Sequence, residues 1–166
     1  MTRLTADIHQ AVAALAAGEL VGMPSETVYG LAADALSEVA ILKVFAAKGR
    51  PENHPLIVHV SNSSQLAQVV SEISLPARQL MQAFWPGPLT LILPKKPELS
   101  LLITGGQSSV AVRMPSHAMF RAVLEALGRP VVAPSANRFE SISPTRASHV
   151  LMELGDRVSV ILEGGD

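Results

Sequence analysis

Apolar residues along this chain alternate between helical spacing and short continuous runs. In residues 5–17, apolar side chains from Ile8 to Leu15 recur at the spacing of one helix face, and Gly18 can end that helix. Residues 20–23 are almost continuously apolar, which is typical of a buried strand. The pattern therefore predicts that an amphipathic helix leads into a strand near the amino terminus.

The same alternation continues along the rest of the chain. Further helices are predicted over residues 37–48, 63–70, 76–84, 116–127 and 144–154. Further strands are predicted over residues 56–60, 89–93, 110–113, 131–133 and 158–162. This order predicts an α/β or mixed α+β fold in which helices flank a largely buried sheet.

Two polar turns directly follow predicted strands. Residues 24–31, which read Pro-Ser-Glu-Thr-Val-Tyr-Gly-Leu, follow the strand at 20–23. Residues 134–137, which read Pro-Ser-Ala-Asn, follow the strand at 131–133. Open α/β sheets bind ligands where strands run into such loops, so we expect a cleft at this rim of the sheet.

Composition narrows the class of protein. The chain has 166 residues, 48% of them hydrophobic and 16% charged, so one globular domain with a sizeable core is expected. The absence of cysteine excludes disulfides, thiol catalysis and cysteine-bound zinc. A formal net charge of −1 gives no overall basic field for nucleic acid. With neither a signal peptide nor an apolar run of ~20 residues, a cytoplasmic protein without a membrane span is expected.

Two short groups carry candidate nucleotide chemistry. Lys48 and Arg50 flank a glycine at a predicted helix end, where they could hold phosphate or simply compensate the helix dipole. Ser135 and Asn137 could bind a phosphate or a base, or form an ordinary turn. Walker A, Gly-x-Gly-x-x-Gly and Gly-x-Ser-x-Gly signatures do not occur.

Two further residues are candidates for substrate contact. Arg113 ends a predicted strand, where it could grip a carboxylate bidentately or lie at the surface. His59 lies inside an apolar strand and is either a core histidine or a functional one. The histidines show no metal-ligand spacing, so no metal-binding residue is assigned.

Together these motifs resemble the YrdC/TsaC family, the threonylcarbamoyl-AMP synthases of tRNA modification. The matching segments, in chain order, are residues 24–31, 48–51, 55–59, 85–90, 112–115, 133–137, 143–145 and 162–165. The resemblance spans almost the whole chain. It implies a YrdC-like twisted open sheet with a large concave cavity.

The resemblance also implies an activity and a set of ligands. L-Threonine, bicarbonate and ATP, commonly with Mg²⁺, would give L-threonylcarbamoyladenylate and pyrophosphate. A downstream complex would transfer the threonylcarbamoyl group to adenosine 37 of tRNA, and some members are described as binding double-stranded RNA. Lys48 and Arg50 would be catalytic. The residues implied for ATP are Lys48, Arg50, Ser135 and Asn137, and those implied for threonine are Ser25, Thr27, His59 and Arg113.

One departure from the family pattern bears on the domain organisation. Family members usually continue past the final glycines with a Ser-Thr-Val-type strand and a later arginine, whereas this sequence stops at Asp166. We therefore expect a single YrdC-like domain over residues 1–166 that lacks this end segment. Two alternatives stay open: a related carbamoyl-transfer enzyme, and a non-catalytic module that binds double-stranded RNA or tRNA.

Overall fold

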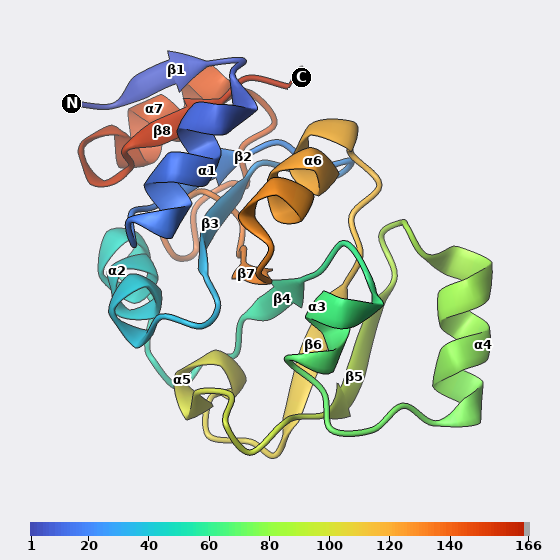
Figure 1. Cartoon of the computed structure of the whole chain (residues 1–166). Coiled ribbons are helices and arrows are strands. Elements are labelled where there is room, and N and C mark those ends of the chain that lie inside the picture. The colour runs from blue at the N-terminus through green and yellow to red at the C-terminus, as the bar shows by residue number, and fades with distance from the viewer. Residues whose placement is uncertain (165–166) are drawn as a thin grey trace.

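A computed structural model describes residues 1–164, and in it eight strands form one mixed sheet (Figure 1). The strands are β1 (Arg3–Thr5), β2 (Val21–Met23), β3 (Gly30–Asp34), β4 (Ile57–His59), β5 (Thr90–Pro94), β6 (Ser109–Arg113), β7 (Val131–Val132) and β8 (Val160–Leu162). Their order across the sheet is β1-β8-β2-β3-β7-β4-β6-β5. β1 and β2 lie parallel to β8, and β4 lies parallel to β6; the other neighbours are antiparallel.

Helices cover both faces of this sheet. They are α1 (Ile8–Ala16), α2 (Glu38–Lys48), α3 (Ser63–Ala67), α4 (Leu75–Phe84), α5 (Leu101–Thr104), α6 (Ala118–Leu127) and α7 (Ala147–Leu154), with a 3-10 turn η1 (Gly155–Arg157). Helices α1 and α6 pack on each other and share one core cluster with β2 and β8, whereas α2 and α7 contribute to the cluster on the opposite face (Figure 1). The fold class predicted from the sequence is thus confirmed.

The sequence pattern missed two strands and a short helix. Strand β3 reads Gly-Leu-Ala-Ala-Asp and is buried throughout, with Leu31 in one core cluster and Ala32 in the other. A strand buried on both faces shows no apolar–polar alternation, and glycine and alanine have low strand propensity. Strand β1 and helix α5 contain three and four residues, too few for a clear periodicity.

The β3 strand brings the two predicted polar turns together. Gly30 forms an antiparallel bridge with Ser135, and the Ala136 amide donates to the Tyr29 carbonyl at 2.8 Å. A Cβ atom added to Gly30 would lie 3.2 Å from the Cβ of Ala133, so the two segments approach closely at a glycine. The turn at 24–29 therefore lies directly beside the segment that leaves β7.

The remaining predictions on chain organisation have separate outcomes. In residues 1–164, every helix is too short or too polar to cross a membrane. The motif predicted at 162–165 includes Gly165, which together with Asp166 lies outside the described residues. The expectation of a single domain that lacks an end segment stays a prediction.

Candidate functional site

The carboxyl end of α2 places Lys48 and Arg50. The Ser37 hydroxyl accepts from the Ala40 amide and caps the start of the helix, as the sequence predicts. At the other end Gly49 adopts a left-handed conformation with φ of 65°, which turns the chain so that Lys48 and Arg50 flank the helix terminus. Lys48 is thus the last residue of the helix, and Arg50 is the first residue after the capping glycine.

Lys48 is buried, and its ammonium group binds backbone carbonyls. Its Nζ atom donates to Ser135 O at 2.5 Å and to Asn137 O at 2.6 Å. Burial, followed by the nearby positive charge of Arg50, lowers the pKa of Lys48 to about 8. The structure therefore joins Lys48 to the Ser135–Asn137 segment by direct contact, with a positive charge at neutral pH.

Arg50 lies on the outer side of the same group. Its Nη2 atom donates to Pro55 O at 2.8 Å, and its guanidinium lies 6.0 Å from the centroid of the Phe139 ring. Burial lowers the pKa of Arg50 from its ordinary value. Its buried Nε atom has no hydrogen-bond partner among residues 1–164, so this donor is available to a ligand.

Asn137 shapes the segment opposite Lys48. Its Nδ2 atom donates to Arg138 O at 2.8 Å and to Ser141 O at 2.7 Å, which closes the loop that follows β7. Its Oδ1 atom is buried and has no partner within the described part of the chain. An unsatisfied buried acceptor is costly in a folded protein, so this oxygen is suited to accept a hydrogen bond from a ligand.

Ser25 and Thr27 form a local hydroxyl pair at the β2–β3 turn. Their side-chain oxygens lie 3.1 Å apart, and the Ser25 hydroxyl donates to Val28 O at 2.5 Å. The Thr27 amide donates back to Ser25 Oγ at 3.3 Å. Ser25 is half-buried and Thr27 is exposed, at the turn where the resemblance implies contacts to threonine.

His59 and Arg113 are paired neighbours on parallel strands β4 and β6. The His59 ring stacks on Phe120 of α6 with centroids 5.0 Å apart. Burial lowers the pKa of His59 to about 4, and a backbone hydrogen bond to Ile57 has a smaller, opposite effect. At neutral pH this histidine is uncharged, and Arg113 supplies the positive charge of the pair.

Glu26 was not singled out from the sequence, although it lies between the predicted residues Ser25 and Thr27. Its Oε1 atom forms an ion pair with Nη2 of Arg113. The only available signal was its place in the motif, because charged turn residues are usually solvated. Its partner, Arg113, lies far along the chain, so the pairing cannot be recognised without the fold.

Tyr29 and His117 are two more residues that sequence reasoning left without a role. The Gly164 amide donates to the Tyr29 hydroxyl at 3.1 Å, and the Gly164 carbonyl lies 3.1 Å from Nε2 of His117. Tyr29 is buried, and it is the single tyrosine in the chain. The two side chains hold the segment that follows β8 beside the turn at 24–29.

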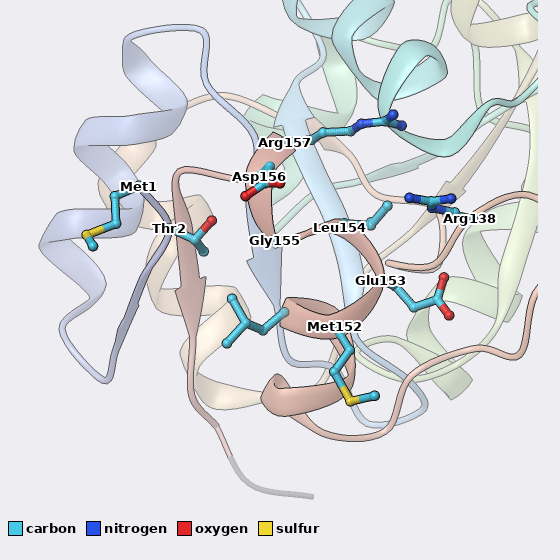
Figure 2. A pocket seen from close by; sticks show the side chains of 10 residues that line it. Met1, Thr2, Arg138, Met152, Glu153, Leu154, Gly155, Asp156 and Arg157 are labelled. Atoms are coloured by element: carbon cyan, nitrogen blue, oxygen red, sulfur yellow. The ribbon is translucent and has the colours of Figure 1, made fainter.

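A surface hollow of about 420 Å³ lies elsewhere, between the amino terminus and the α7–η1 segment (Figure 2). None of the eight predicted site residues lines it. Arg157, on its rim, extends toward α2 and donates from Nη1 to Ala46 O and Ala47 O (Figure 2). The large concave cavity implied by the resemblance therefore stays a prediction for the Lys48 and Arg113 region.

Comparison with known sequences decides the family. A sequence model named Sua5_yciO_yrdC, described as telomere recombination, matches residues 13–166. The chain belongs to the Sua5/YciO/YrdC family. This confirms the resemblance drawn from the ordered motifs.

Relatives within the family are similar along nearly the whole chain. The threonylcarbamoyl-AMP synthase of Bacillus subtilis is 47% identical, over 95% of this chain and 46% of that protein. The synthase of Vibrio vulnificus is 35% identical, over 97% of this chain and 88% of that protein. The crystal structure of Pyrococcus abyssi Sua5 complexed with L-threonine superposes with a TM-score of 0.95 at 42% identity, covering all of this chain and 51% of that one.

The chain spans about half the length of the Bacillus and Pyrococcus relatives. Shared fold and family are established across this span.

Proposed function

We propose that this chain synthesises L-threonylcarbamoyladenylate and pyrophosphate from L-threonine, bicarbonate and ATP. One structural observation carries the proposal: the segment 24–31 connects two groups of residues for which the family resemblance implies different substrates. At one end Gly30 bridges to Ser135, beside Lys48. At the other end Glu26 pairs with Arg113, next to His59. Nucleotide and amino-acid contacts would thus share one wall.

The chemistry requires two anions to meet. The amine of threonine and bicarbonate would give N-carboxy-threonine and water, and a carbamate oxygen would then attack the α-phosphorus of ATP. The bond from that phosphorus to the pyrophosphate leaving group breaks, so the adenylate and pyrophosphate are the products. Lys48 and Arg50 would offset the repulsion between carbamate and triphosphate, which makes positioning and electrostatics the main catalytic effects.

The remaining predicted residues would bind rather than react. Ser135 and Asn137 would contact the nucleotide, and the unsatisfied Oδ1 atom of Asn137 supports such a contact. Arg113 would bind the threonine carboxylate, with the Thr27 hydroxyl and the uncharged His59 ring nearby. No protein nucleophile is needed, which agrees with a chain that has no cysteine.

Mg²⁺ would accompany the ATP phosphates. Among residues 1–164, no group of three or more histidine, aspartate or glutamate side chains could hold a metal ion unaided. Mg²⁺ is commonly bound through substrate phosphates and water with few protein ligands, so this donor set fits an ion that arrives with the nucleotide. When bound, the ion would neutralise phosphate charge.

We further propose that the product passes to a complex that modifies adenosine 37 of tRNA in the cytoplasm. Threonylcarbamoyladenylate is a reactive mixed anhydride, so an acceptor enzyme must consume it before water does. Direct contact with tRNA or double-stranded RNA is a second element of this proposal. The net charge of −1 does not favour RNA binding. The basic pair Lys48 and Arg50 is the local feature that favours it.

Pyrophosphate release by the 166-residue chain tests the proposal. We expect release only when L-threonine, bicarbonate and ATP are all present, with the adenylate detected by mass spectrometry. Omission of either threonine or bicarbonate should return the rate to background. Absence of release, or equal ATP turnover without threonine, would contradict the proposal. RNA binding that depends on salt and occurs without nucleotide turnover would favour the non-catalytic alternative.

A further inference from the structure

Glu26 joins the 24–29 turn to the amino end of α6. Its Oε2 atom accepts from the Ser116 amide at 2.7 Å, from the Ser116 hydroxyl at 2.8 Å and from the His117 amide at 3.0 Å. Its other oxygen pairs with Arg113. Both carboxylate oxygens are therefore occupied, and the side chain links a strand end, a turn and a helix start.

Arg113 is held from a second direction as well. Its Nε atom donates to Gly87 O at 3.3 Å, and the Gly87 amide in turn donates to Met114 O at 2.8 Å. The Arg113 side chain is 11% exposed. A planar guanidinium that donates through Nε to Gly87 O and is paired at Nη2 with Glu26 has its orientation fixed.

We propose that Glu26 is a positioning residue that orients Arg113 for the carboxylate of the amino-acid substrate. The inference rests on the proposed function, because it requires an amino acid in this site. Glu26 already satisfies the amide donors of Ser116 and His117, so a substrate carboxylate is directed to Arg113 instead of the helix terminus. If Glu26 instead competed with the substrate for Arg113, removing the charge of Glu26 would tighten substrate binding.

Glu26→Gln keeps the size of the side chain and removes its charge. We expect the KM for L-threonine to rise about tenfold, since a charge-assisted contact is weakened, while the KM for ATP changes less than about twofold. Calorimetry should also show that the preference for L-threonine over L-threoninamide narrows in this variant. Glu72→Gln, an exposed glutamate in the segment before α4, is the matched control and should leave all three quantities unchanged.

A purely structural role would move both KM values and the melting temperature together, and that outcome would overturn the inference. Tighter threonine binding by Glu26→Gln would overturn it in favour of competition. If the wild-type chain shows no turnover, the proposed function is wrong, whatever the result for Glu26. A double-mutant cycle in urea unfolding then tests whether Glu26 and Arg113 interact. Glu26→Gln and Arg113→Met should then be less destabilising together than the sum of the two single changes, whereas additive effects would refute the pairing.

Discussion

Lys48 donates a hydrogen bond at 2.6 Å to the backbone carbonyl of Asn137, which is 89 residues further along the chain. The ammonium group also binds Ser135 O. A lysine that the sequence assigns to phosphate therefore has a structural partner before any nucleotide arrives. Its charge and its support of the loop after β7 have to be separated by experiment.

Lys48→Met should lower both stability and turnover. Two carbonyls lose their donor, so the free energy of unfolding should fall by about 1–3 kcal/mol, as measured by urea unfolding. Pyrophosphate release should fall at least tenfold under conditions where the variant is still folded. Lys95→Met is the matched control, because Lys95 also donates to backbone carbonyls, those of Lys96, Pro97 and Leu99. Lys95→Met should lower stability without lowering turnover. An equal loss of turnover in both variants would contradict a specific role for Lys48.

Arg50→Gln should weaken ATP binding with little effect on stability. Arg50 donates a hydrogen bond to Pro55 O and is partly exposed. The free energy of unfolding should therefore change by less than about 1 kcal/mol. The KM for ATP should rise about tenfold, because a charged contact to phosphate is lost. An unchanged KM for ATP in a folded variant would show that Arg50 does not contact the nucleotide.

Acid should destabilise the protein through His59. The pKa of His59 is lowered by burial to about 4, from about 6.5 in an unfolded chain. Between these values the unfolded state binds more protons at His59 than the folded state does, so the free energy of unfolding falls as the pH is lowered. His59→Phe preserves a ring against Phe120 and should reduce the loss between pH 7 and 4.5 by about 2 kcal/mol.

Chemical denaturation at the two pH values measures this difference. His149→Phe is the control, since His149 is exposed on α7, and it should retain the acid sensitivity of the wild type. Equal acid sensitivity of wild type and His59→Phe would show that His59 is protonated as easily in the fold as outside it.

Features set by neighbouring residues could be predicted from the sequence, whereas contacts between distant residues could not. Helix α2 could be predicted because its signals are local: Ser37 caps its start, and Gly49 turns the chain at its end. The contact of Lys48 with Asn137 and the pairing of Glu26 with Arg113 are set by strand order, which no local pattern specifies. Residue types could thus be assigned to ligands from the motifs, whereas their partners inside the protein could not.

Asn137→Asp should weaken the loop after β7. The carboxylate cannot donate to the carbonyls of Arg138 and Ser141, both of which now receive a hydrogen bond from Nδ2. We expect faster amide exchange across residues 138–143 and a free energy of unfolding lower by about 1–3 kcal/mol. Exposed Asn53→Asp is the control and should change neither. Unaltered exchange in Asn137→Asp would mean that other contacts hold the loop.

Arg157→Met tests whether the hollow in Figure 2 is coupled to the candidate site through α2. Arg157 donates to the carbonyls of Ala46 and Ala47 at 3.2 and 2.8 Å, which are end groups of the helix that carries Lys48. Losing this cap should cost about 1 kcal/mol of stability and raise the KM for ATP about threefold, because the Lys48 backbone becomes less rigid. Arg138→Met, on the rim of the same hollow, should do neither. If both variants raise the KM equally, the effect comes from surface charge near the nucleotide and not from the helix end.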